Sequence, residues 1–277
     1  MADRFEGDHK LATIVVSPGT TEIYDMRFFS YGVLRRVDLP PSVTHIRDEA
    51  FLLCFCLESV TIPNVVEIGK YAFARCTALK EVKTGPALRT VGQCAFEHCS
   101  ALAEILIPGS VQHVPTSAFS KCTAATRIVI GHGVRSVDAW AFSSCQSVTE
   151  LELPDTLECI GVNAFKGLSS LKSIVLPPKL STVDFGAFNA CGALTRIVAP
   201  TPQLYNAVTI MLPPKTATAL KWRPADAMTY FWSPQTHARM PAAAQKKILA
   251  VYLVWQRYNL PSELARVVLE FTLRHVF

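Results

Sequence analysis

Hydrophobic residues recur along this chain with a period of 22 to 23 residues, and the clearest marker of the period is an Ala-Phe pair. The pairs are Ala50-Phe51, Ala72-Phe73, Ala95-Phe96, Ala118-Phe119, Ala141-Phe142, Ala164-Phe165 and Ala187-Phe188. Successive phenylalanines lie 22 residues apart once and 23 residues apart five times. A period of this length, kept over seven copies, is typical of a protein built from stacked repeats.

Each copy of the repeat begins with the pattern of a short β-strand. In the copy Leu171–Leu194, Ile174 and Leu176 alternate with outward positions and are followed by a proline, which is the period of two expected of a strand. The frame also extends toward the N-terminus, because Phe28 precedes Phe51 by the same 23 residues. In total it fits nine strands and eight phenylalanine positions between residues 11 and 200.

A single turn of 23 residues is too small to bury its own apolar face, so neighbouring turns must stack and share one core. Each strand then pairs in parallel with the strand of the next turn at a spacing of ~4.8 Å, which gives a sheet roughly 40 Å long. We expect the phenylalanines to form an aromatic column inside. The sequence therefore predicts a mainly β repeat solenoid of about eight to nine turns over residues 1–200.

The complete frame, L-x-x-I-x-L-P-x-x-L-x-x-I-x-x-x-A-F-x-x-C-x-x-L, resembles the BspA-type leucine-rich repeat over about residues 11–200. This resemblance implies a right-handed solenoid with a parallel sheet on one face and short strands or turns on the other. It also implies a binding protein, since family members include surface adhesins of bacteria and parasites as well as proteins inside algal and protist cells.

The repeat register is lost after residue 200. Residues 201–232 are predicted to form an irregular capping segment, and residues 233–277 a C-terminal α-helical hairpin. The apolar residues expected to cover the open end of the core are Leu204, Tyr205, Val208, Ile210, Met211 and Leu212. The apolar stripes of the two hairpin helices are Ile248, Val251, Tyr252 and Trp255, then Leu264, Val267, Val268 and Phe271.

The segment from residue 260 to residue 271 is similar to the opening helix of an F-box. Leucine-rich repeats joined to an F-box would form the substrate adaptor of a ubiquitin ligase, whose partner is the F-box-binding linker protein. The alternative is a hairpin that caps or packs against the solenoid. We favour the capping or packing hairpin, because an F-box needs two further helices and the sequence stops at residue 277.

Charge and targeting signals indicate an intracellular, cytoplasmic protein. Residues 1–220 hold 19 basic and 19 acidic residues, so the net charge of +5 lies in the last 57 residues, where 8 basic residues oppose 3 acidic ones. These basic residues form no dense cluster, and we expect neither nucleic acid nor a membrane span. The charged start, the absence of an Asn-x-Ser/Thr sequon and the odd number of cysteines favour the inside of a cell.

Six of the nine cysteines occupy one place in the repeat, three residues after the phenylalanine. They are Cys54, Cys76, Cys99, Cys122, Cys145 and Cys191. Leu168 fills the same place in another copy, which indicates a buried apolar position, and a free cysteine behaves there as a small hydrophobic residue. We favour a ladder of buried thiols over disulfides or a metal site, and we expect no metal and no cofactor.

The outward residues of the strands form two columns on the sheet, where repeat proteins commonly bind their partners. Several of these positions are apolar, which favours contact with a partner protein or with the tail over ordinary solvated positions. The candidate partner-binding residues are Glu81, Lys83, Glu104, Leu106, Arg127, Val129, Glu150, Glu152, Val175, Arg196 and Val198.

Catalytic motifs are missing from the sequence, which has no phosphate loop, nucleophile elbow, zinc helix or dinucleotide fingerprint. The adjacent pair His98 and Cys99 resembles a catalytic dyad, but Cys99 belongs to the repeat core. We therefore expect a non-catalytic scaffold that binds another protein. An F-box-like substrate adaptor is the second hypothesis, and a surface adhesin is the third.

Overall fold

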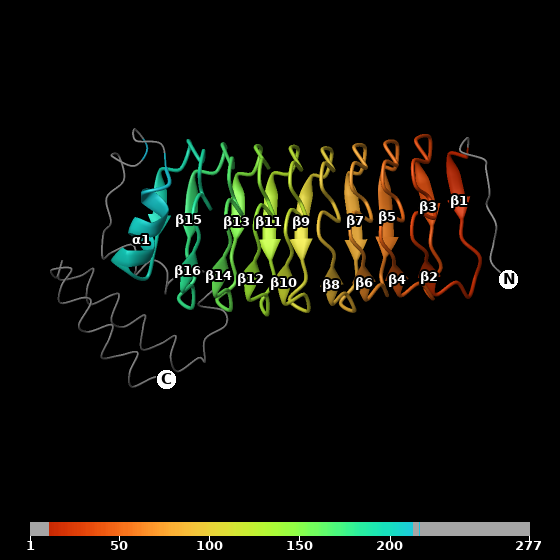
Figure 1. The fold of residues 1–277 in the computed structure, drawn as a ribbon, viewed down its shortest axis with the longest axis horizontal. Coiled ribbons are helices and arrows are strands. Elements are labelled where there is room, and N and C mark those ends of the chain that lie inside the picture. Colours follow the sequence, from red (N-terminus) through yellow and green to blue (C-terminus); the bar gives the residue numbers. More distant parts are fainter. Residues whose placement is uncertain (1–10, 213–215, 217–277) are drawn as a thin grey trace, which may run out of the picture.

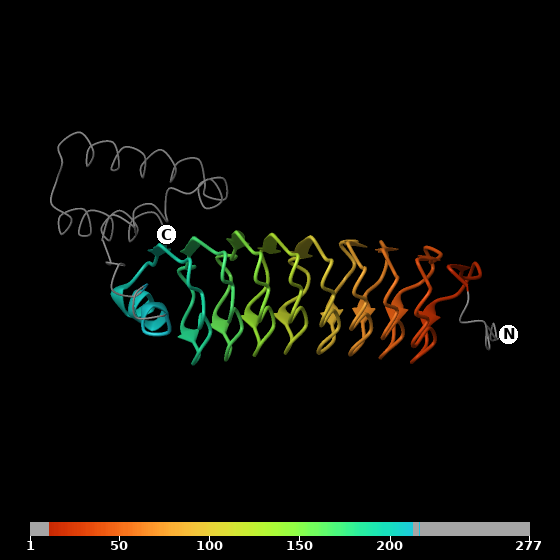
Figure 2. The same ribbon diagram turned by 90° about the horizontal axis from the view of Figure 1, so that it is seen from above.

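The structure, a computed structural model, describes residues 11–212 and residue 216. These residues form an elongated solenoid whose turns stack along one axis, with β1 at one end and α1 at the other (Figures 1 and 2). Each turn contributes a longer strand to one side and a two-residue strand to the other. We call these sides the long-strand face and the short-strand face.

The strands alternate between the two faces along the chain. The strands of the long-strand face are β1 (Thr13–Val15), β3 (Arg36–Asp38), β5 (Ser59–Ile62), β7 (Glu81–Thr84), β9 (Glu104–Ile107), β11 (Arg127–Ile130), β13 (Glu150–Glu152), β15 (Ser173–Val175) and β17 (Arg196–Val198). The strands of the short-strand face are β2 (Glu22–Ile23), β4 (His45–Ile46), β6 (Glu67–Ile68), β8 (Thr90–Val91), β10 (His113–Val114), β12 (Ser136–Val137), β14 (Cys159–Ile160) and β16 (Thr182–Val183). The predicted nine strands are confirmed.

Pairing between turns is parallel and in register with the repeat. Ile128 of β11 lies between Ile105 of β9 and Leu151 of β13, at the same repeat position in each turn. Ile128 and Ile105 are buried and Leu151 is partly buried, while the residues before and after them point outward. The alternation read from the sequence therefore places one side of each strand in the core.

The predicted aromatic column runs through the core. Eight phenylalanines stack ring on ring with centroid distances of 5.0–5.5 Å, within the range of favourable offset stacking. They are Phe28, Phe51, Phe73, Phe96, Phe119, Phe142, Phe165 and Phe188. The rings join the turns into one continuous core opposite the strand aliphatics.

Two residues in the left-handed region flank each phenylalanine and turn the chain. Around Phe142 they are Trp140, with φ 60°, and Ser144, with φ 64°. A non-glycine residue in this conformation costs roughly 1–2 kcal/mol. The hydrogen bond from Phe142 N–H to the carbonyl of Ala164 in the next turn, 2.8 Å long, helps to hold the turn in place.

The cysteines form the predicted ladder of buried thiols. Each of the six repeat cysteines donates its Sγ–H to the carbonyl oxygen of the phenylalanine one turn earlier, at 3.0–3.4 Å. All nine cysteines are free. Burial raises the pKa of the Cys191 thiol to about 12 and raises the pKa of Cys76, Cys99 and Cys122 as well. These thiols are therefore unreactive at neutral pH while the turn stays closed.

The segment after the last strand differs from the predicted irregular structure, because α1 (Pro202–Thr209) is a helix. Thr201 caps it by accepting a hydrogen bond from Leu204 N–H at 3.3 Å, and a proline starts it. An N-cap threonine followed by a proline is a typical start of a helix, and it acts locally, independently of the repeat. Tyr205, Val208 and Leu212 join the core, which confirms the expected cover at this end, whereas Ile210 is exposed.

The remaining predictions for the tail, namely the rest of the capping segment, the helical hairpin at 233–277 and the F-box-like string at 260–271, lie outside the described residues. Within residues 11–212, no helix is long and apolar enough to cross a membrane.

Both sheets are interrupted at the same level of the stack. On the long-strand face β1, β3, β5 and β7 form one sheet, β9 to β13 a second, and β15 with β17 a third. On the short-strand face β2 to β8 form one sheet and β10 to β16 another. In residues 11–212, only the level between β7-β8 and β9-β10 therefore lacks strand pairing on both faces.

Candidate binding surface

The candidate residues predicted from the sequence all lie on strands of the long-strand face, and all of them except Val198 are exposed or half-buried. The exposed ones are Glu81, Lys83, Glu104, Leu106, Glu150, Val175 and Arg196, and the half-buried ones are Arg127, Val129 and Glu152. Val198 was predicted to point outward, but it is only 2% exposed. The chain leaves the repeat after β17, so the alternation stops and Val198 and Ala199 are both buried.

Arg127 organises the charges at the centre of this face. Its guanidinium lies 2.7 Å from a carboxylate oxygen of Glu152 and 3.4 Å from one of Glu150. The hydrogen bond to Glu152 raises the pKa of Arg127. Lys83 pairs with Glu81 at 3.3 Å. Because such exposed pairs contribute only about 0–1 kcal/mol, a partner can replace them at little cost.

Glu104 differs from these acidic residues, because no cation of the described residues lies within ion-pair distance of its carboxylate. Its neighbour Leu106 is 55% exposed and lies beside Val129 in the register of β9 and β11. The positive charge of Arg127, its register neighbour, still acts on Glu104 at longer range. A carboxylate outside salt-bridge distance, next to aliphatic groups on the surface, is the feature of this face that best fits contact with another protein.

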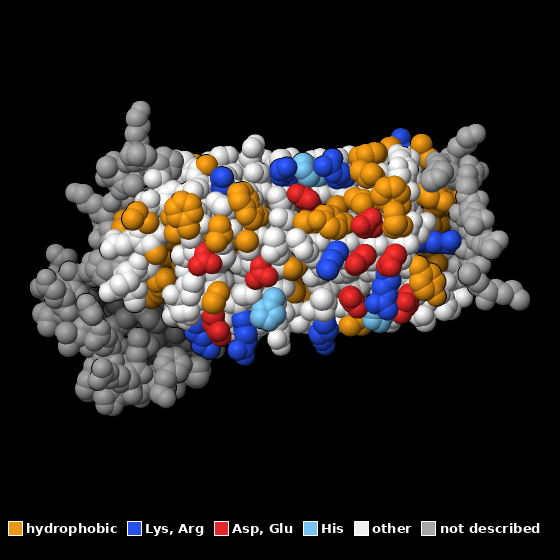
Figure 3. Space-filling view, viewed as in Figure 1, with side chains coloured by type: hydrophobic (Ala, Val, Ile, Leu, Met, Phe, Trp, Pro, Cys, Tyr) orange, Lys and Arg blue, Asp and Glu red, His pale blue; other side chains and the backbone are white. Residues whose placement is uncertain are grey.

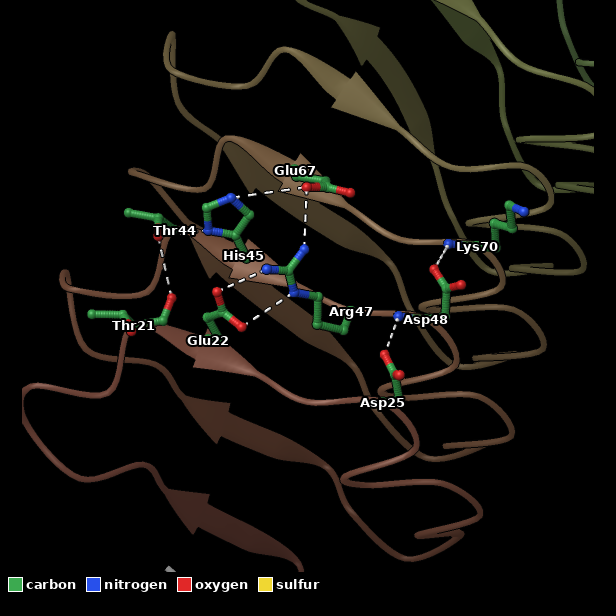
Figure 4. A network of polar contacts seen from close by, with 9 residues as sticks. All are labelled: Thr21, Glu22, Asp25, Thr44, His45, Arg47, Asp48, Glu67 and Lys70. Carbon is green, nitrogen blue, oxygen red and sulfur yellow. Dashed lines mark hydrogen bonds and ion pairs between the residues drawn. The ribbon is translucent and has the colours of Figure 1, made fainter. Parts of the chain in front are cut away.

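A second charged cluster lies on the short-strand face over the N-terminal turns, at the lower right of Figure 3. Figure 4 shows that Arg47 bridges three turns, with contacts of 2.7 Å and 3.2 Å to Glu22 and 3.4 Å to Glu67. The hydrogen bond from Arg47 lowers the pKa of Glu22. His45 lies 3.8 Å from Glu67.

This cluster was not predicted from the sequence, although one signal pointed to it. Glu22, His45 and Glu67 occupy the same position in three successive turns, and Arg47 follows His45 by two residues. Side chains at equivalent positions of stacked turns lie next to each other, which leaves both glutamates within reach of Arg47. The network links its own turns, which favours a structural role over ligand binding.

Three basic side chains form a row at left-handed positions on the edge of the solenoid. They are Arg75, His98 and Lys121, each two residues after its phenylalanine. The Lys121 ammonium donates to Nε2 of His98 at 3.0 Å, so the His98 ring is neutral there. Burial lowers the pKa of His98, and the positive charges of Lys121 and Arg75 lower it further against the opposing charge of Glu97.

We therefore expect the imidazole of His98 to titrate below the ~6.5 of an ordinary histidine. Since the folded state then binds protons less readily than the unfolded state, this residue should reduce stability as the pH falls below about 6.5. An NMR titration of the imidazole signals measures the pKa. The variant Lys121→Gln should raise it, and a wild-type midpoint at or above the ordinary value would contradict the assignment.

The geometry of polar groups does not favour catalysis. His113 Nδ1 lies 2.8 Å from Ser136 Oγ, which in turn donates to Asp138 at 3.3 Å. The hydroxyl lies between the imidazole and the carboxylate, whereas a catalytic triad needs the imidazole in the middle. Cys99 is buried and donates to the core, away from an attacking position. No group of three metal-binding side chains occurs in the described residues.

Comparisons with known proteins agree with the repeat. The model of the BspA type leucine rich repeat region matches residues 2–126 and 89–206, in six copies. No curated protein matches the sequence. Proteins of this repeat class are generally non-catalytic and bind other proteins.

Two solved structures show the same fold. A leucine-rich repeat protein from Bacteroides ovatus is 26% identical, with a TM-score of 0.63, and the match covers 70% of this chain and 50% of that protein. A leucine rich repeat protein of T. pallidum is 29% identical, with a TM-score of 0.55, over 58% of this chain and 78% of that protein. The chain spans half the length of the Bacteroides ovatus protein. With the repeat, the stacked core and the family model in agreement, the chain belongs to the BspA-type leucine-rich repeat family.

Proposed function

We propose that this protein is a non-catalytic scaffold that binds a partner protein on its long-strand face. The observation that carries the proposal is that exposed Leu106 and Val175 share the extended long-strand face with Glu104, whose carboxylate lies outside salt-bridge distance of the described cations. Apolar groups rimmed by charges are typical of protein interfaces. The repeat class, whose extended faces commonly bind proteins, supports the same role.

We also propose that the protein acts inside a cell, in the cytoplasm. The nine free cysteines support this location, because thiols persist in reducing compartments and tend to oxidise outside them. Fractionation of the source cells tests it, and recovery of the protein only from the cell surface or the medium would contradict it.

The double variant Leu106→Lys with Val175→Lys tests the binding face. Affinity capture of partners from the protein's own cells, quantified by mass spectrometry, should lose at least about tenfold of the specific partner, because two charges would be buried in an apolar contact. The control is Val162→Lys with Ile210→Lys, two residues that are also exposed but lie off the strands of the long-strand face.

Equal capture by the wild type and the double variant would remove the long-strand face as the binding site. Melting temperatures of all variants should match that of the wild type, since the substituted side chains are exposed.

A further inference from the structure

The turn that holds β7 and β8 is separated from the turn that holds β9 and β10. Neither pair of neighbouring strands shares ladder hydrogen bonds, and Figure 1 shows the two turns set apart. The two turns are still joined before the strands by the hydrogen bond from Ala103 N–H to the Lys80 carbonyl at 3.3 Å. After the strands they are joined by the hydrogen bond from Phe96 N–H to the Ala118 carbonyl at 2.7 Å and by the stack of Phe96 on Phe119 at 5.1 Å. The turns therefore meet before and after the strands and in the core but part along the long strands.

Particular residues account for the separation. A Cβ on Gly85 would meet the carbonyl oxygen of Pro63, so β7 lies close against the preceding turn. A Cβ on Gly109 would meet the carbonyl oxygen of His132, so the turn of β9 lies close against the following one. On the short-strand face, Pro115 has no N–H to donate to the preceding turn. Asp138, the equivalent residue of the next turn, makes this bond and donates its N–H to the carbonyl of Val114 at 2.8 Å.

An opening lies between β7 and β9 and leads from the long-strand face into the core. We call it the β7–β9 cleft. Its cavity has a volume of about 30 Å³, room for a methyl-sized group, and its lining includes Val82, Thr84, Ile105 and Leu106. At the repeat position of Thr84, the neighbouring strands β5 and β9 both carry a buried isoleucine.

The inward-pointing side chain of β7 is therefore more exposed than its counterparts in the next two turns. Val82 is half-buried, whereas its counterparts Ile105 and Ile128 in the next two turns are 2% and 0% exposed. Glu104, whose carboxylate lies outside salt-bridge distance of the described cations, also lines the cleft. The cleft therefore offers an apolar cavity, a carboxylate outside salt-bridge distance of the described cations, and the two facing edges of β7 and β9, which do not pair with each other.

We propose that the β7–β9 cleft receives an extended segment of a partner protein, with an aliphatic side chain in the cavity and a Lys or Arg next to it at Glu104. Free strand edges supply backbone donors and acceptors to an extended segment, while side-chain contacts select its sequence. The carboxylate selects a basic segment, since a buried acidic residue beside Glu104 would be repelled. This inference rests on the proposed function and places its binding contact at one level of the solenoid.

A phage-displayed heptapeptide library, panned against the full chain, tests the cleft without a known partner. Enriched peptides should share an aliphatic residue beside Lys or Arg. For the best synthetic peptide, fluorescence anisotropy should show a Kd weakened at least about tenfold by Thr84→Ile, which fills the cavity, and by Glu104→Lys, which reverses the charge. The matched control Thr61→Ile adds the same atoms on the outer side of β5 and should change the Kd less than about twofold.

Thr84→Ile should melt no lower than the wild type, which separates loss of the site from loss of the fold. The proposal is overturned if the library yields no enriched peptide, if the best peptide binds Thr84→Ile as tightly as the wild type, or if light scattering shows that the cleft is instead covered by a second copy of the chain. Loss of capture by Leu106→Lys with Val175→Lys but not by Thr84→Ile would keep the binding face and reject the cleft.

Discussion

Replacing Phe142 by alanine is expected to lower the free energy of unfolding by about 3–5 kcal/mol. The Phe142 ring is fully buried and stacks between Phe119 and Phe165, each at 5.5 Å. Its removal leaves a cavity and breaks the aromatic column at one level. In a linear stack each turn contacts only its neighbours, so the turns on either side should also lose coupling.

Denaturant unfolding followed by circular dichroism and by tryptophan fluorescence measures both effects. For the wild type the two curves should coincide, and for Phe142→Ala they should separate. The control Phe185→Ala removes the same side chain from a position that is 79% exposed and should change stability by less than about 0.5 kcal/mol. A single transition shifted by less than about 1 kcal/mol would contradict the role given to the column.

Gly109→Ala is the second substitution with a large expected effect. A Cβ at this position would meet the carbonyl oxygen of His132 in the following turn, and a backbone atom cannot move aside as a flexible side chain can. The two turns would have to separate, so we expect a loss of about 1–3 kcal/mol. Thermal and denaturant unfolding of the variant measure the loss.

Gly192→Ala is the matched control, because a Cβ at Gly192 would meet no atom within 4 Å. Its expected effect ranges from none to a gain of about 0.4–1 kcal/mol from the stiffer unfolded chain. Equal stability of Gly109→Ala and the wild type would show that the close contact between these two turns does not hold them together.

The repeat period alone was sufficient to predict most of the fold, because each turn repeats the same packing problem. The nine strands, the stacked rings and the buried thiols all follow from positions at which the sequence scarcely varies. Helix α1 was missed because Thr201 and the proline after it act locally and have no counterpart in the repeat. Val198 was misplaced because its outward position was extended into the last turn, where the chain departs.

The candidate site was less predictable than the fold. The columns of outward residues were correct apart from Val198, but the β7–β9 cleft depends on departures from the repeat, namely Thr84, Gly85 and Pro115. Each of these residues is ordinary by itself. Their combined effect requires the three-dimensional neighbours that only stacking provides, such as the carbonyl of Pro63 against Gly85.

The thiol ladder gives the solenoid a set of internal reporters. Six sulfurs lie along its axis, each sealed in its own turn and hydrogen-bonded to the turn before. A reagent reaches such a sulfur only when that turn opens, so the labelling rate of each cysteine reads the opening free energy at one height of the stack. The six cysteines thus report local unfolding at six heights of the stack, and no residue has to be substituted to introduce them.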